Sequence, residues 1–277
     1  MNVHVEDPAS RDATSVAAIE ETTAYAPPPD TLREIAFGSP VDASLIERVR
    51  IVRARGGGQL RTVITGTKTV RTIAYVSRRY GCIRYGEATT ECVRLPAEEL
   101  CPRTIEAVAQ YVRVEALVGG RWFRTIVDGA ATYADGSAAL IECKRDWSDF
   151  RTRTGQTQCV LARLGARCLG MRYEPYVLAH AGSERRQASV AEVQSARFVH
   201  VSDALAARVS ALLSRGSASL LHVANELSPQ YHLGRAMVFA LVARRIVEVD
   251  LEGDLGPTIE CRATPRPSEA IRPLEEY

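Results

Sequence analysis

A β-hairpin pattern over residues 122–144 constrains the fold more than any other part of this sequence. Two runs of β-prone residues flank the triplet Ala-Asp-Gly at 134–136, and Asp-Gly is a strong turn signal. Residues 88–100 and 154–164 have helical patterns, and the apolar residues 176–178 predict a further strand. A hairpin followed by a helix and a strand builds a mixed sheet flanked by helices, so we expect an α/β fold.

Three polar residues of this hairpin can carry chemistry. Glu142 and Lys144 stand two positions apart on the second strand, so both project from one face while Cys143 points into the packing on the other. If the loop has three residues and its glycine is left-handed, Asp128 lies directly opposite Glu142, with Cβ atoms about 5 Å apart. A two-residue loop would instead place Asp128 opposite Cys143, and the site would then need a bulge.

This arrangement suits hydrolysis of a phosphodiester bond. Two carboxylates can share one Mg²⁺ ion, which lowers the pKa of a bound water that Lys144 would orient or deprotonate. An edge strand with a surface Glu and Lys is the competing interpretation, because Glu-x-Lys often occurs by chance. Lysine is scarce here, since Lys68 and Lys144 are the only two among 35 basic residues. Arginine supplies positive charge elsewhere, which favours a chemical role for Lys144.

Residues 66–178 resemble the PD-(D/E)XK nucleases, and within them the TnsA-type transposon-end endonucleases. The pattern of that family is a helical Glu, an Asp-Pro, a Gln-Pro, a Pro-Asp at a strand, an Asp-Gly turn and Glu-x-Lys. The corresponding positions here are Glu91, Cys101-Pro102, Gln110-Tyr111, Val127-Asp128, Asp135-Gly136 and Glu142-Cys143-Lys144. Two prolines of the motif are replaced, by Tyr111 and Val127, and the polar residue beside each is kept, whereas Cys101 stands where the family has the Asp of Asp-Pro.

The resemblance implies a fold, an activity and partners. The fold would be a restriction-endonuclease-like core, and the enzyme would cut double-stranded DNA with Mg²⁺, or with Mn²⁺ in its place. Asp128 and Glu142 would bind the metal, Lys144 would serve the attacking water, and Glu91 would complete the catalytic set. A DDE-type transposase and an ATPase regulator would be the partners in transposition. The alternatives are a stand-alone restriction or repair nuclease and a catalytically silent DNA-binding assembly protein.

The distribution of charge predicts a nucleic-acid partner. The formal net charge is only +2, but residues 48–86 carry ten Arg or Lys and no Asp or Glu. A solvated basic surface is the alternative interpretation, although a stretch of this length without an acid is long for one. The candidate contacts to DNA phosphates are Arg53, Arg55, Arg61, Lys68, Arg71, Arg78, Arg79 and Arg84.

Pattern and composition divide the chain into four segments. Residues 1–45 form an acidic arm that we expect to be disordered, and 46–185 form the nuclease domain. Residues 186–201 predict a linker. Three short helical patterns and a hairpin pattern over 202–277 predict a winged-helix domain. Its third helix is poor in side chains that read bases, so we expect this domain to dock a protein and to bind DNA weakly.

Composition also excludes several classes of protein. No apolar run approaches the roughly twenty residues that span a bilayer, and residues 1–16 lack a secretory signal, so we expect a cytoplasmic protein without a membrane partner. Seven cysteines without a Cys-x-x-Cys pair argue against a disulfide framework and a zinc site. The glycine stretches at 55–59 and 65–69 lack the spacing of nucleotide-binding loops, so we expect neither ATP nor NAD.

Overall fold

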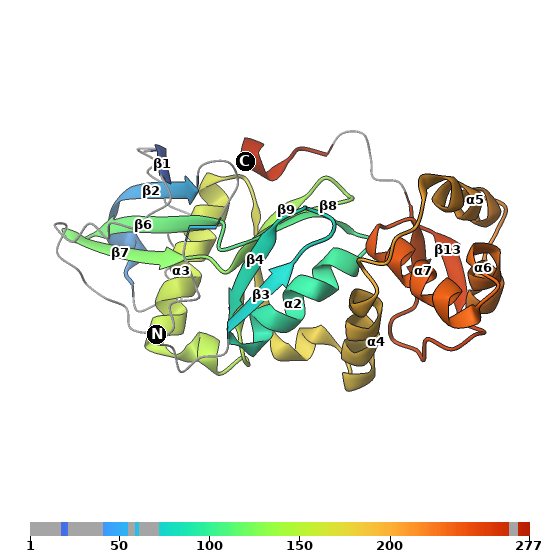
Figure 1. The fold of residues 1–277 in the computed structure, drawn as a ribbon. Coiled ribbons are helices and arrows are strands. Elements are labelled where there is room, and N and C mark those ends of the chain that lie inside the picture. Colours follow the sequence, from blue (N-terminus) through green and yellow to red (C-terminus); the bar gives the residue numbers. More distant parts are fainter. Residues whose placement is uncertain (1–17, 22–40, 55–58, 61–71, 266–270) are drawn as a thin grey trace.

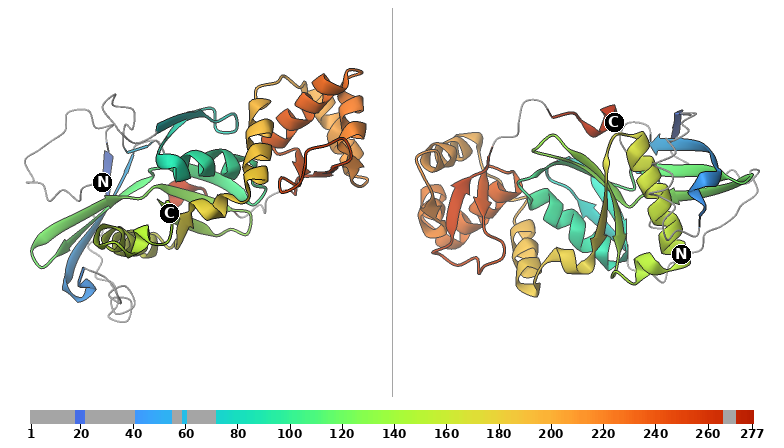
Figure 2. Two further views of the ribbon diagram at one scale, coloured as in Figure 1. Left: turned by 90° about the horizontal axis from the view of Figure 1, so that it is seen from below. Right: turned by 180° about the vertical axis from the view of Figure 1, so that it is seen from behind.

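The computed structural model describes residues 18–21, 41–54, 59–60, 72–265 and 271–277. It shows an elongated molecule in which small sheets and helices follow one another from one end to the other (Figures 1 and 2). The expected mixed α/β organisation is confirmed. Within these ranges no helix is both long enough and apolar enough to cross a lipid bilayer.

A mixed sheet forms the middle of the molecule. Its strands are β5 (Thr104–Ala109), β8 (Gly129–Tyr133), β9 (Ala138–Lys144) and β10 (Arg172–Val177), in the order β10-β9-β8-β5. Strand β8 is antiparallel to both neighbours, whereas β10 runs parallel to β9. Parallel strands need a crossover connection, and α3 (Arg153–Cys168) provides it. The predicted order of hairpin, helix and strand is therefore present. The hairpin begins only at Gly129, because the first residues of the predicted range 122–144 belong to a strand of another sheet, β7 (Arg121–Ile126).

The turn between β8 and β9 sets their register. Tyr133 N donates to Ser137 O at 2.8 Å, which leaves three residues in the loop. Gly136, the last of the three, has a φ of 80°, a left-handed conformation that suits a residue without a Cβ. The strands then pair Gly129 with Ile141. The three-residue loop forms, and the two-residue alternative does not.

Side chains of β9 alternate between the two faces of the mixed sheet. Leu140 packs in the larger core cluster with Leu161 and other buried residues of α3. Ile141 belongs to a smaller cluster on the opposite face. Glu142 and Lys144 continue the set that begins with Leu140, so they lie on the same side of the sheet as α3.

A second, antiparallel sheet packs on α3. Its strands, in the order β1-β2-β6-β7, are β1 (Ala18–Glu21), β2 (Ile46–Ala54), β6 (Val112–Val118) and β7 (Arg121–Ile126). Helix α3 contacts β6 and β7 as well as β9 and β10, so it joins the two sheets. Strand β1 lies in the arm over 1–45 for which we expected disorder, and so do the buried Val41 and the 3-10 turn η1 (Ala43–Leu45). That expectation was wrong for these residues.

A hairpin and a helix lie beside the mixed sheet. The hairpin consists of β3 (Thr72–Val76) and β4 (Ile83–Glu87), and it leads directly into α2 (Ala88–Leu100). Helix α2 packs against β3 and β4, as can be followed in Figure 1, and also against β5. Its first turn meets the end of β9, where Thr90 Oγ1 donates to Lys144 O at 3.2 Å.

A helix occupies most of the predicted linker. Helix α4 (Glu184–Ser195) begins after Ser183, whose side chain caps its first turn. Val190 and Val193 of α4 are buried, and the helix packs against α2 and a helix of the C-terminal unit. The linker prediction was therefore wrong for these residues, because the polar composition concealed two apolar positions on one helical face.

Residues 203–263 form a unit at one end of the molecule (Figure 1). Its strands form an antiparallel sheet in the order β11-β13-β12. Ser202 and Ser219 cap its first two helices, as is typical of serine at helix N-termini. Its elements are α5 (Asp203–Leu213), β11 (Ala218–Ser219), α6 (Leu220–Leu227), α7 (Tyr231–Ala243), β12 (Val247–Val249) and β13 (Glu260–Ala263).

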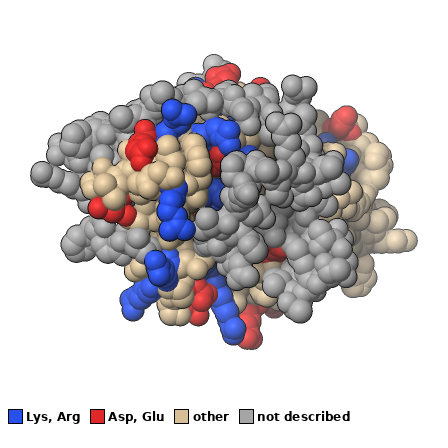
Figure 3. Space-filling view, turned by 90° about the vertical axis from the view of Figure 1, so that its left-hand side faces the viewer, with Lys and Arg blue, Asp and Glu red and all other residues tan. Residues whose placement is uncertain are grey.

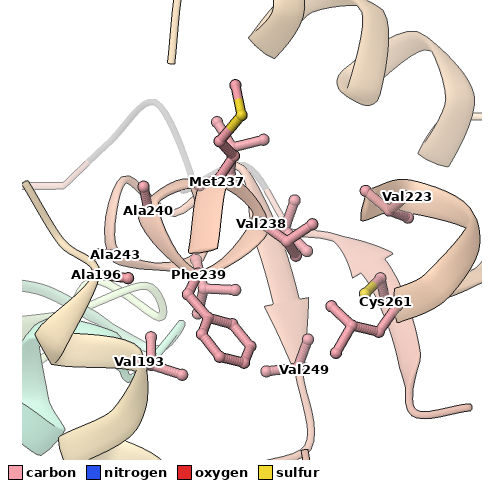
Figure 4. Packing of buried hydrophobic residues seen from close by; sticks show 14 of the residues in the cluster. Val193, Ala196, Val223, Met237, Val238, Phe239, Ala240, Ala243, Val249 and Cys261 are labelled. Carbon is pink, nitrogen blue, oxygen red and sulfur yellow. The ribbon is translucent and has the colours of Figure 1, made fainter. Parts of the chain in front are cut away.

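Helix α7 lies inside the core of this unit. Every residue from 237 to 243 is buried, and Figure 4 shows several of them, Phe239 included, in the hydrophobic cluster. The same cluster contains Val193 from α4 and Leu100 from α2. Hydrophobic packing therefore continues from the C-terminal unit into the part of the molecule that carries the mixed sheet.

The last seven residues leave the C-terminal unit and return to the mixed sheet. Leu274 is only 1% exposed and belongs to the core cluster around α3. Its backbone O accepts from Tyr111 Oη at 2.6 Å, and its N donates to Glu106 Oε2 at 3.0 Å. The predicted domain over 202–277 is therefore too long at its end.

Short 3-10 turns lie at η1 (Ala43–Leu45), η3 (Asp149–Arg151), η4 (Leu178–Ala181) and η5 (Leu274–Glu276).

Candidate active site

Asp128 and Glu142 face each other across the β8–β9 pair. Asp128 immediately precedes β8, and continuing the Gly129–Ile141 register by one residue places it opposite Glu142. Cys143 N donates to Asp128 Oδ2 at 2.7 Å, which holds this carboxylate beside the end of β9. The strand register therefore brings the two carboxylates together.

Lys144 forms an ion pair with Glu142. The Lys144 Nζ atom lies 2.6 Å from Glu142 Oε1, and the two side chains are 16% and 1% exposed. Burial by itself lowers the pKa of Lys144, but the charges of Glu142 and Asp128 outweigh it and raise that pKa above its ordinary value. Lys144 is therefore an ammonium group, which can donate hydrogen bonds and supply charge but is a poor base. Of the two roles considered for it, orienting the water is favoured.

Glu91 reaches the same site from the first turn of α2. Its side chain is buried, and Oε2 has no hydrogen-bond partner among the described residues. Burial raises the pKa of Glu91 to about 9, with a further contribution from the charge of Asp128, and Arg94 and Lys144 act in the opposite direction. Glu91, Asp128, Glu142 and Lys144 thus form one electrostatic group, contributed by α2, β9 and the residue before β8.

Glu142 is the most deeply buried acid of this group. Burial and the negative charge of Asp128 raise its pKa to about 8, although Lys144 lowers it. Without a further positive charge, the site therefore retains a proton near neutral pH. Any ligand that brings positive charge would favour loss of that proton.

The oxygen atoms of this group fit a hard divalent cation. Glu91 Oε2 and Glu142 Oε2 are both buried, and neither has a hydrogen-bond partner within the described ranges. Unpartnered buried carboxylate oxygens are costly, and a divalent cation would satisfy them. In the part of the chain that the structure describes, no three His, Cys, Asp or Glu side chains are grouped as a metal cluster. One or two carboxylates nevertheless suffice for Mg²⁺, which keeps several waters and binds substrate phosphate.

Arg94 supports the site in a way that sequence reasoning missed. It is fully buried on α2, where it pairs with Glu98 at 2.9 Å and donates to Asp128 O at 3.3 Å. A Cβ at Gly129 would lie 2.8 Å from Arg94 Cζ, so only a glycine at this position leaves room for the guanidinium group beside the strand. The spacing of Arg94 and Glu98 could predict a helix pair, but no pattern in the sequence indicates its contact with β8.

The predicted DNA-binding residues occupy different environments. Arg78 is exposed, whereas Arg79 is half-buried and donates to Thr104 O at 2.9 Å and to Ile105 O. Arg84 is 7% exposed and stacks on Tyr80, with 4.1 Å between its Cζ and the ring centroid. The burial of Arg84 argues against a phosphate contact, which requires an accessible guanidinium.

Arg53 contacts the returning C-terminal segment. It donates to Glu275 O at 3.2 Å and to Tyr277 O at 3.3 Å. Its guanidinium therefore has partners within the chain. Four further predicted contacts lie outside the described residues, namely Arg55, Arg61, Lys68 and Arg71.

Acidic partners offset part of the basic segment. Arg50 on β2 and Arg113 on β6 both pair with Glu115, at 2.5 Å and 2.7 Å. The end of the molecule that carries β2, β6 and β7 has blue and red side chains on its described surface (Figure 3). Counting charges along the sequence therefore overstates the positive charge of this end, because Glu115 lies outside the basic segment but next to it in space.

Comparison with known proteins adds no assignment. No family model matches the chain, and no curated protein matches it significantly.

Proposed function

We propose that this protein is a metal-dependent DNA endonuclease that hydrolyses phosphodiester bonds. One observation carries the proposal: Glu142 has a buried and unpartnered Oε2, its Oε1 lies 2.6 Å from the ammonium group of Lys144, and the charge of nearby Asp128 raises its pKa. A fold without such a role gains little from burying two acids and a lysine, because charged groups lose solvation on burial. A catalytically silent scaffold does not account for this cost.

The residues of the site have distinct roles in the proposed reaction. Asp128 and Glu142 would hold Mg²⁺ or Mn²⁺, which when bound neutralises charge on the scissile phosphate and lowers the pKa of a coordinated water. Lys144 donates from its ammonium group toward the attacking water or the phosphate and so orients them. Glu91 adds negative charge to the same group and favours retention of the cation. Arg94 holds the backbone at Asp128 and acts as a positioning residue.

The finer fold assignment belongs to this proposal. The mixed sheet with α2 and α3 on it would be the restriction-endonuclease-like core. The order α5-β11-α6-α7-β12-β13, with the sheet order β11-β13-β12, supports a winged helix. The burial of residues 237–243 argues against a role for that part of α7 in a DNA groove, and it supports a docking role for this unit.

A TnsA-type role in transposition follows from the motif resemblance. The supporting residues are Glu91, Asp128, Glu142 and Lys144, which meet although they come from separate segments of the chain. Under this proposal a DDE-type transposase and an ATPase regulator are the partners, and double-stranded DNA at a transposon end is the substrate. Exposed Arg78 is the described member of the basic set best placed to contact phosphate.

Plasmid cleavage tests the proposed activity. We expect the wild-type protein to nick supercoiled DNA in Mg²⁺ or Mn²⁺ and not in EDTA. Lys144→Met should lower the nicking rate about 100-fold or more, a loss typical for removal of a group that stabilises developing charge. Its DNA affinity, measured by fluorescence anisotropy in Ca²⁺, should stay within about threefold of wild type, because other residues make the contacts to the DNA backbone. Equal nicking with and without divalent cations would contradict the proposal.

A further inference from the structure

A group of aromatic side chains lies directly beyond the catalytic lysine. Trp147 is 50% exposed, and its ring centroid lies 5.6 Å from that of Phe150 and 5.7 Å from that of His180. The His180 ring meets Tyr176 of β10 edge-on at 5.5 Å. The rings therefore form a continuous group, contributed by the segment that follows β9, by β10 and by η4.

This aromatic group adjoins the candidate active site. The Nζ atom of Lys144 lies 5.8 Å from the Phe150 ring centroid. A backbone hydrogen bond holds η4 beside the segment that follows β9, since Leu178 N donates to Arg145 O at 3.1 Å. A molecule bound at Lys144 would therefore lie beside Phe150, whose ring contacts the exposed side chain of Trp147.

Packing accounts for Tyr176, which lies against a core cluster, and His180 Nδ1 accepts a hydrogen bond from Val177 N at 3.4 Å. Neither kind of contact accounts for Trp147. Trp147 and His180 are exposed, and no residue of η3 is buried, so this segment adds little to the core. Aromatic rings that are grouped and exposed beside a site form a surface that a ligand can cover. Arg145, Arg151 and Arg153 are exposed along the same segment. They outnumber its two acids, Asp146 and Asp149, so the segment keeps a net positive charge, which favours a ligand that carries negative charge.

We propose that Trp147, supported by Phe150 and His180, is a stacking platform for an unpaired nucleobase next to the scissile phosphate. The inference rests on the proposed nuclease function and names a structural feature of its substrate. Every nucleobase has a π-face that stacks on an aromatic ring, and neighbouring arginines can contact the adjoining phosphates. DNA with a frayed, flapped or single-stranded stretch at the cleavage point would thus bind better than a fully paired duplex.

The two tryptophans of the chain allow a direct test. Trp122 is similarly exposed, at 44%, but lies on β7 and outside this aromatic group. In Trp122→Phe, emission excited at about 295 nm comes from Trp147 alone, and stacking with a base quenches it. We expect an oligothymidylate added in EDTA to quench that emission. The remaining tryptophan of Trp147→Phe should be unaffected.

Affinity measurements complete the test. Trp147→Ala should weaken binding of a labelled single strand about tenfold, the loss expected for one stacked base, and should weaken binding of blunt duplex far less. Trp122→Ala is the matched control and should bind both DNAs as wild type does. The proposal would be wrong if DNA did not quench the emission of Trp147 and if Trp147→Ala bound the single strand as tightly as wild type. The exposed rings would then be better explained as a contact surface for a protein partner. Because EDTA prevents cleavage, this result is independent of whether Glu142 and Lys144 are catalytic.

Discussion

At the scale of single residues, the buried carboxyl group of Glu142 determines how the site responds to pH. Burial and Asp128 raise its pKa to about 8, from an ordinary value of 4.5. The folded protein therefore keeps a proton that the unfolded chain releases at lower pH. The stability contributed by this group is complete below the unfolded pKa and is lost as pH rises through the folded one.

This titration predicts a pH-dependent melting temperature. The Tm of the metal-free protein should fall between about pH 6 and about pH 8, and Glu142→Gln, which cannot ionise, should show a smaller fall. Scanning calorimetry in EDTA measures both. Glu226→Gln, a change at a partly exposed acid of α6, serves as the control and should behave as wild type. Identical pH profiles for Glu142→Gln and wild type would contradict the assigned pKa.

Gly129 is a second residue whose role can be tested by itself. In Gly129→Ala the added methyl group would meet the Arg94 guanidinium, and the side chain or strand must shift. We predict a loss of about 1–3 kcal/mol in the free energy of unfolding, as is usual for overpacking in a core. Gly253→Ala is the control, because a Cβ there meets nothing within 4 Å. Urea unfolding gives both values, and equal stability of the two variants would refute the packing argument.

At the scale of elements, the sequence predicts what depends on local chemistry. The β8–β9 register follows from the Asp-Gly turn, so the meeting of Asp128 and Glu142 could be worked out without a structure. The positions of Arg94 and β1 depend on distant segments, and no local pattern encodes them. Helix α4 was missed for a different reason, since its two buried valines were outnumbered by polar neighbours.

The returning segment around η5 makes a testable contribution to stability. Leu274 is buried among residues of the α3 core. Leu274→Ala should lower the free energy of unfolding by about 2 kcal/mol or more, because a buried cavity would form. Exposed Glu276→Ala should change it by less than about 0.5 kcal/mol. A Leu274→Ala protein as stable as Glu276→Ala would show that the segment is not held in solution.

At the scale of the whole molecule, DNA affinity should depend on exposed charge rather than on the count of basic residues. Arg78→Glu should weaken binding to all duplexes alike and reduce the salt dependence of affinity by about one phosphate contact. Arg79 is a poor choice for this test, because its bonds to β5 backbone oxygens make its replacement structurally disruptive. Arg208→Glu on α5 is the control, with a side chain 54% exposed.

Anisotropy titrations at several salt concentrations would measure the DNA affinity and its salt dependence for Arg78→Glu and for the control Arg208→Glu. An Arg78→Glu protein with the affinity and salt dependence of Arg208→Glu would remove Arg78 from the DNA interface. A loss confined to one sequence would contradict phosphate binding, because phosphates carry no sequence information.

Hydrolysis at the site formed by Asp128, Glu142 and Lys144 is tested most directly by the nicking rate of supercoiled plasmid in Mg²⁺. The proteins to compare are wild type, Glu142→Gln and the control Glu226→Gln. We predict that wild type and Glu226→Gln nick at similar rates, and that Glu142→Gln is slower by about 100-fold or more. A Glu142→Gln protein that nicks DNA as fast as the other two would contradict the assignment of this site.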